Sequence, residues 1–256
     1  MQLTKFLFHK ILCMNLVIDI GNTSVKMALF ECNKIIASQR LEKIDVNIIQ
    51  DFCDKNLSVS HVIISAVKDY PKEINTFLEK NYTFSLFTHQ LPIPLTNKYL
   101  SPETLGKDRL AAAIGANALF PNQNVLVIDA GTALKFDFVN KYNEYLGGAI
   151  SPGIQIRYKA LHSFTGKLPL LNSTINAELI GTTTQSSMES GVLNGILAEV
   201  EGIVEQYNQK YTDLQIVLTG GDHNYFDKRL KIKTFVAPNI VLEGLNLILN
   251  YNIEKY

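Results

Sequence analysis

The 256-residue chain has no excess of charge of either sign and no long hydrophobic run. Its 24 basic and 24 acidic side chains balance, so it lacks the positive surface expected of a nucleic-acid-binding protein. No apolar run approaches the ~20 residues that a membrane-spanning helix needs. The 3 cysteines and 5 histidines show no C-x-x-C or zinc-site spacing, which disfavours a disulfide scaffold and favours a reducing cytoplasm. We therefore expect a cytoplasmic protein with no nucleic-acid or membrane partner.

The common nucleotide-binding patterns are also missing. The chain contains no G-x-x-x-x-G-K-[ST] motif, which disfavours a P-loop kinase. It also has no G-x-G-x-x-G at the start of a helix, which disfavours a dinucleotide-binding Rossmann domain and a protein kinase. The hydrophobic fraction of 46% is nevertheless ample for buried cores, and the length suits one large domain or two lobes.

One short turn occurs twice, each time after an apolar run: Asp19-Ile20-Gly21-Asn22-Thr23 and Asp129-Ala130-Gly131-Thr132. The glycines are expected to adopt positive φ and let the backbone approach an anion, with the following amides and the threonine hydroxyls as donors. The aspartates suit Mg²⁺, held directly or through water. A single copy would be ordinary hairpin punctuation. Two copies favour a duplicated ATP-binding fold with one phosphate-binding hairpin per lobe.

The strand and helix signals repeat in the two halves of the chain. In the first half we expect strands at 15–20, 24–30, 34–38, 61–66 and 82–87, helices at 46–56, 71–80 and 102–119, and a loop at 91–101. In the second half we expect strands at 124–129, 133–139, 144–150 and 214–219, and helices at 154–162, 184–207 and 240–251. This order predicts an α/β protein of two duplicated lobes, each a mixed sheet flanked by helices. The predicted division is an appendage at 1–13, a first lobe at 14–101 and a second lobe at 102–256.

The segment Gly106-Lys107-Asp108-Arg109 opens an alanine-rich helix. Asp108 is a candidate base for the proton of an attacking hydroxyl. Arg109 is a candidate to bind an acidic or carbonyl-bearing substrate. The alternative is purely structural: an aspartate near the helix start and an arginine facing solvent.

Taken in order, the motifs resemble those of type III pantothenate kinases, members of the actin, sugar kinase and Hsp70 superfamily. They are D-x-G-N-T at 19, G-x-D-R-x-A-A-A-x-G-A at 106, D-A-G-T-A at 129 and G-G-x-I-x-P-G at 147. The resemblance runs from Met14 to near the C-terminus. It implies actin/ribonuclease-H-like lobes and ATP-dependent phosphorylation of pantothenate to 4′-phosphopantothenate, the first step of coenzyme A biosynthesis.

The resemblance also implies roles for individual residues, with Asp108 as the catalytic base and Asp129 as the ligand of a monovalent cation, K⁺ or NH₄⁺. ATP and Mg²⁺ are the other implied cofactors. The implied ATP-binding residues are Asp19, Ile20, Gly21, Asn22, Thr23, Ser24, Val25, Lys26 and Thr132. The implied pantothenate-binding residues are Tyr99, Gly106, Lys107, Asp108, Arg109 and Thr184.

The family works as a homodimer, which suggests the alanine-rich helix and the helix from Thr184 as interface elements. One departure is Lys135, where the family usually has a small or hydroxylated residue; this lysine either points outward or alters the cation site. Two other functions stay open: a kinase of the same fold with another small substrate, and a non-catalytic ATP-binding accessory factor for transcription. The presence of Asp19, Asp108 and Asp129 favours an enzyme.

Overall fold

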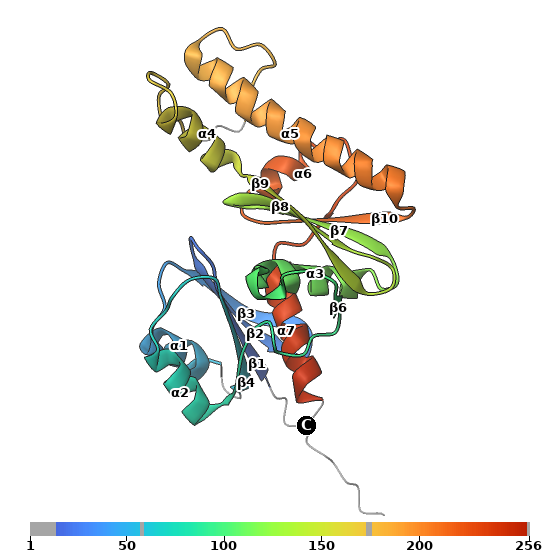
Figure 1. Cartoon of the computed structure of the whole chain (residues 1–256). Helices are drawn as coiled ribbons and strands as arrows, with labels where there is room; N and C mark the ends of the chain where they lie inside the picture. Colours follow the sequence, from blue (N-terminus) through green and yellow to red (C-terminus); the bar gives the residue numbers. More distant parts are fainter. Residues whose placement is uncertain (1–13, 57–58, 173–175, 255–256) are drawn as a thin grey trace, which may run out of the picture.

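The computed structural model describes residues 14–56, 59–172 and 176–254. The predicted appendage at 1–13 lies outside the described residues. Two sheets, each flanked by helices, lie one above the other in Figure 1. Their strand orders are β3-β2-β1-β4-β5 and β11-β10-β7-β8-β9-β6. The predicted class, an α/β fold with two mixed sheets, is confirmed.

The first sheet starts with an antiparallel meander and continues with parallel strands. Its strands are β1 (Met14–Ile20), β2 (Val25–Glu31), β3 (Lys34–Leu41), β4 (Val59–Ala66) and β5 (Thr83–Leu86). Helices α1 (Val46–Asp54) and α2 (Glu73–Asn81) cover one face and share a core with β1, β2 and β4. The start of α1 is fixed by Asp45, whose Oδ1 accepts a hydrogen bond from the Ile48 amide at 2.9 Å.

The second sheet repeats this order. Its strands are β7 (Asn124–Ala130), β8 (Ala133–Val139), β9 (Glu144–Pro152), β10 (Leu214–Thr219), β6 (Thr96–Asn97) and β11 (Phe235–Val236). Helices α4 (Ile154–Ser163), α5 (Thr184–Lys210) and α6 (His223–Asp227) lie over its outer face. Sequence patterns did not predict β6, β11 or α6, because elements of two to five residues show no measurable periodicity.

Two helices fill the space between the sheets (Figure 1): α3 (Lys107–Leu119), after the short 3-10 helix η1 (Pro102–Thr104), and α7 (Ile240–Ile253). Their backbones approach so closely that a Cβ on Gly244 would lie 1.9 Å from the Ala111 carbonyl oxygen. Helix α7 follows the second sheet in sequence yet packs on the first, where Asn15 Nδ2 donates to Asn246 Oδ1 at 2.8 Å. Because α7 belongs to the second half of the chain but packs on the first sheet, the lobe boundary at 101/102 stays a prediction.

The alanine-rich face of α3 is buried within the single chain. Ala111, Ala112, Ala113 and Ala116 are each at most 1% exposed, in a core shared with α7 and both sheets. The alanines expected at a subunit interface are packed inside the chain instead, because their small side chains serve the contact with α7. Among the described residues, no helix is both long and apolar enough to cross a membrane.

Candidate active site

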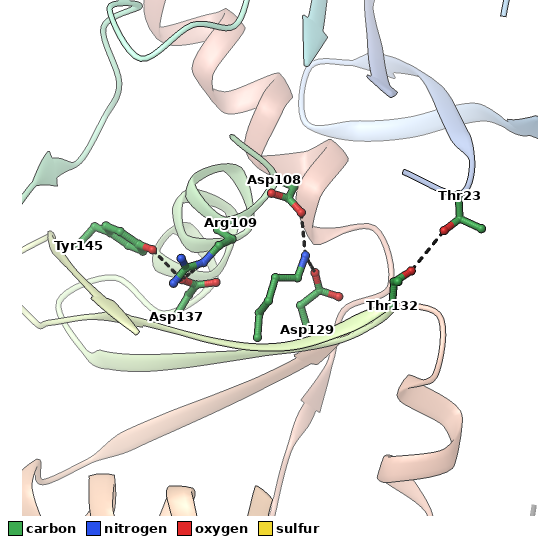
Figure 2. A network of polar contacts seen from close by, with 8 residues as sticks. Thr23, Asp108, Arg109, Asp129, Thr132, Asp137 and Tyr145 are labelled. Carbon is green, nitrogen blue, oxygen red and sulfur yellow. Dashed lines mark hydrogen bonds and ion pairs between the residues drawn. The ribbon is translucent and has the colours of Figure 1, made fainter. Parts of the chain in front are cut away.

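The two predicted hairpin turns face each other across the space between the sheets. The first joins β1 to β2, with the Gly21 amide donating to the Ser24 carbonyl at 3.0 Å. The second joins β7 to β8, with the Gly131 amide donating to the Ala133 carbonyl at 3.2 Å. The hydroxyl oxygens of Thr23 and Thr132 lie 3.2 Å apart and are exposed (Figure 2). The duplicated motif thus forms one place in the fold, with donors from both lobes.

The expected positive φ at Gly21 and Gly131 is wrong. Among the described residues, the glycines with positive φ are Gly147 and Gly220. Gly21 is confined in another way, because a Cβ there would lie 3.1 Å from the Ser24 carbonyl oxygen. Gly220, at φ +95°, packs on the second turn, where a Cβ would lie 2.5 Å from Asp129 Oδ1.

Asp19 is the buried carboxylate of the first turn. Its side chain is 8% exposed, and Oδ1 is buried without a hydrogen-bond partner. Burial, reinforced by the negative charges of Asp108 and Asp129 and opposed by Lys26 and Lys135, raises the pKa of Asp19 to about 7. A divalent cation beside Asp19 would offset this penalty.

The residues of this site fit a Mg²⁺ ion that is held by a carboxylate together with the phosphates of a nucleotide. The described part of the chain contains no cluster of three or more His, Cys, Asp or Glu side chains able to form an all-protein metal cage. Mg²⁺ keeps several waters and usually takes one or two carboxylates together with substrate phosphates. The unpartnered oxygen of Asp19, at the phosphate hairpins, is such a ligand.

Asp108 and Asp129 are joined by the ammonium group of Lys135. Lys135 Nζ lies 2.7 Å from Asp108 Oδ2 and 2.7 Å from Asp129 Oδ2 (Figure 2). Although burial lowers the pKa of Lys135, the charges of Asp129 and Asp108 outweigh it and raise that pKa above its ordinary value. Of the two possibilities for this departure from the family pattern, the structure shows that Lys135 points into the site.

Arg109 makes a buried ion pair with a residue that sequence patterns had not singled out. Its Nε and Nη2 lie 2.9 and 2.7 Å from Asp137 Oδ1, and Tyr145 donates to the same oxygen at 2.6 Å. The Arg109 guanidinium carbon also lies 5.8 Å from the centre of the Tyr99 ring. The exposed fractions of Arg109 and Asp137 are 5% and 1%. Arg109 thus anchors α3 to the second sheet, and its role in substrate binding stays a prediction.

Two other predicted site residues lie near the first hairpin or the start of α3, and a third lies far from them. Lys26 lies directly opposite Asp19 in the β1–β2 register, and Lys107 Nζ donates to the Ala66 carbonyl at 3.1 Å, which ties the start of α3 to the end of β4. Thr184 is different, because it begins α5, whose N-terminal end lies at the outer tip of the molecule, far from α3 (Figure 1). One signal for the missed residue was available: Lys135 and Asp137 are two apart on a strand, so both charged side chains lie on one face.

A cleft of about 290 Å³ lies next to the first hairpin. It is lined by side chains of β2 and β3 and by the segments before α6 and α7, including Lys26, Arg40, Gly220, Gly221 and Asn239. Arg40 Nε donates to Ser24 Oγ at 3.1 Å, so the cleft borders the turn directly. A larger hollow of about 520 Å³, lined by Phe138, Tyr207 and Tyr211 among others, contains none of the predicted site residues. Chemistry rather than size therefore selects the smaller cleft.

Solved structures of other proteins share this fold. A ROK family glucokinase from Streptomyces griseus, solved with glucose and AMPPNP, matches with a TM-score of 0.52 and 11% identity, over 93% of this chain and 99% of that one. A Campylobacter jejuni structure named for a Baf family transcriptional activator matches with a TM-score of 0.59 and 19% identity, over 93% and 99% of the two chains. At such identities the likeness shows the fold alone, which this chain shares with a sugar kinase.

Sequence comparison shows the particular family. The family model of type III pantothenate kinase matches residues 15–206. The type III pantothenate kinase of Flavobacterium johnsoniae is 39% identical over 243 residues, covering 94% of this chain and 100% of the relative. That of Cytophaga hutchinsonii is 40% identical over 240 residues, covering 94% and 100%. The chain belongs to the type III pantothenate kinase family.

Proposed function

We infer that this protein transfers the γ-phosphoryl group of ATP to pantothenate and releases 4′-phosphopantothenate and ADP. Family membership over nearly the whole chain supplies the reaction, the first step of coenzyme A biosynthesis. The observation that carries the assignment to this site is the position of Asp108, which shares Lys135 with Asp129 of the second phosphate hairpin. A base for the acceptor hydroxyl and donors for the phosphates are thereby held in one place.

The nucleotide is proposed to lie in the cleft beside the first hairpin. Thr23, Thr132 and the backbone amides of both turns would hold the phosphate oxygens, because they offer exposed donors from two sides. Lys26 and Arg40 line the cleft and would neutralise phosphate charge. Phosphoryl transfer asks the protein mainly for positioning and charge stabilisation, and this arrangement offers both.

Asp19 is proposed to hold Mg²⁺ together with the ATP phosphates. When bound, Mg²⁺ supplies positive charge that neutralises the phosphate oxygens during transfer. Asp19 itself contributes a fixed carboxylate oxygen with no competing protein donor. Lys26 stands opposite Asp19 in the β1–β2 register, so the two side chains lie on the same face of the sheet.

Asp108 is proposed to accept the proton of the pantothenate hydroxyl. Its Oδ2 accepts a hydrogen bond from Lys135 at 2.7 Å, and its Oδ1 lies beside Gly106, where a Cβ would come within 2.7 Å. Gly106, Lys107, Arg109 and Tyr99 would form the surrounding wall, since all lie at the start of α3 or against it. A base held in this way contributes about 10²–10⁴-fold to the rate.

A homodimer is proposed to complete the acceptor site. Thr184 lies far from α3 in its own chain, so it would reach pantothenate only in the site of a second copy. Leu179 and Ile180, just before α5, are 81% and 78% exposed, as expected of residues that a partner covers. A K⁺ or NH₄⁺ ion at Asp129 stays a hypothesis, because Lys135 already contacts that carboxylate. The cytoplasmic location likewise stays a prediction.

An ADP-release assay tests the proposed function. The protein is incubated with MgATP alone, with pantothenate, and with acetate or glucose as other acceptors. We expect ADP release to require pantothenate. Release with another acceptor but not pantothenate would favour a different kinase of this fold, and nucleotide binding without turnover on any acceptor would favour a non-catalytic regulator.

A further inference from the structure

We propose that the ammonium group of Lys135 is a built-in monovalent cation of the active site, filling the place between Asp108 and Asp129 that a free K⁺ or NH₄⁺ ion would otherwise occupy. This inference rests on the proposed kinase function and deepens it. Lys135 is then a positioning residue, which holds the base and offsets the negative charge of the site.

The contacts of Lys135 are those of a cation bound between two carboxylates. Nζ lies 2.7 Å from one oxygen of each aspartate, within the range of charge-assisted N–H to carboxylate bonds. A lysine ammonium has three N–H donors. Two of them serve Asp108 and Asp129, so Lys135 presents to these oxygens the same chemistry as a bound NH₄⁺ ion.

The fold places Lys135 directly beside Asp129. Lys135 and Asp129 are direct cross-strand partners in the β7–β8 pair, so their side chains stand side by side on one face. On the other side of Asp129, the backbone at Gly220 closes on Oδ1, where a Cβ would come within 2.5 Å. Lys135 contacts the other oxygen of this carboxylate, Oδ2, at 2.7 Å. The aspartate expected to bind a free cation therefore already contacts a cationic group of its own chain.

The site needs a cation there for electrostatic reasons. The site holds three carboxylates, those of Asp19, Asp108 and Asp129, and two of them contact the same ammonium group. ATP brings further negative charge to the same place. Lys135 contacts two of the three carboxylates and is attached to the sheet, so it is present at every turnover without being drawn from solution.

The kinetic test compares salts in wild type and in Lys135→Met. Wild-type kcat should change by less than about twofold when KCl is replaced by choline chloride at equal ionic strength, because only general screening differs. In choline chloride, kcat of Lys135→Met should be about 10²-fold below that of wild type. KCl or NH₄Cl should raise the kcat of this variant by at least about tenfold. Lys135→Arg should remain independent of the salt, and Lys141→Met, a change at an exposed lysine of the β8–β9 turn, should behave as wild type.

A second readout does not depend on turnover. The melting temperature of ligand-free wild type should be equal in KCl and choline chloride, whereas that of Lys135→Met should be higher in KCl, because the ion binds only the folded variant. A wild-type kcat that drops tenfold or more without K⁺ or NH₄⁺ would overturn the inference, as would wild-type turnover by Lys135→Met in choline chloride. If wild type makes no product in any salt, the proposed function fails, and the melting comparison alone decides the role of Lys135.

Discussion

The buried pair of Arg109 and Asp137 makes the sharpest stability prediction. Asp137→Ala removes the acceptor of both the Arg109 guanidinium and the Tyr145 hydroxyl, at a place where Asp137 is 1% exposed. Water cannot replace the lost carboxylate without opening the contact between α3 and the second sheet. Removing one partner of a buried ion pair costs about 3–5 kcal/mol, since the other charge is left uncompensated.

This cost is a large part of the stability of the whole protein. Domains unfold with a free energy of about 5–15 kcal/mol. At about 2–4 °C per kcal/mol for a chain of this size, the melting temperature of Asp137→Ala should fall by about 6–20 °C. Differential scanning calorimetry at neutral pH measures the shift, with circular dichroism to confirm that the variant is folded below its transition.

Two controls separate the buried charge from a loss of contacts in general. Lys98 pairs with Glu144 at 3.4 Å, but the two side chains are 52% and 30% exposed, so Lys98→Ala should cost at most about 1 kcal/mol. The double change Arg109→Met with Asp137→Leu removes both charges and should be more stable than Asp137→Ala, because no buried charge is left alone. A melting temperature of Asp137→Ala within about 2 °C of wild type would refute the reasoning.

Three further predictions concern α3 and the first hairpin. Ala112→Glu should yield insoluble or unfolded protein rather than a folded monomer, because Ala112 is 1% exposed against α7, and size-exclusion chromatography distinguishes the outcomes. Asp108→Asn should keep nucleotide binding, measured by calorimetry, and lose about 10²–10⁴-fold in kcat; near wild-type turnover would exclude Asp108 as base. The folded pKa of Asp19, about 7, lies above its unfolded value of 3.8, so its stabilising contribution is complete below about pH 4 and is lost as the pH rises through 7. As the pH rises from about 5 to about 8, the melting temperature of ligand-free Asp19→Asn should therefore increase relative to that of wild type. A constant difference between the two melting temperatures would contradict the raised pKa of Asp19.

The parts of the fold that sequence predicted are those with local causes. Apolar runs ending in Asp-x-Gly turns gave the strands β1, β2, β7 and β8 to within a residue or two, because each hairpin is specified by its own residues. Their duplication predicted one hairpin per lobe, and the structure brings the two turns together at Thr23 and Thr132. The predicted positive φ at Gly21 and Gly131 was wrong, because a close contact with the backbone can require glycine without a positive φ.

Other features depend on tertiary partners that no local pattern specifies. An alanine-rich helix suits close packing, but whether its neighbour is another chain or a distant helix depends on Gly244 meeting Ala111. The two-residue alternation of Lys135 and Asp137 places them on one face, yet only the fold shows that one reaches Asp108 and Asp129 while the other meets Arg109. Sequence therefore predicted a candidate catalytic segment but not the ion pairs that its residues make.

Direct identification of the product tests the central claim. Wild type and Asp108→Asn are each incubated with MgATP and pantothenate, and the products are followed by phosphorus NMR and mass spectrometry. Wild type should form one 4′-phosphopantothenate for each ADP, and both signals should be lost with Asp108→Asn at equal nucleotide occupancy. Wild-type protein that binds ATP but forms no phosphorylated pantothenate would contradict this claim.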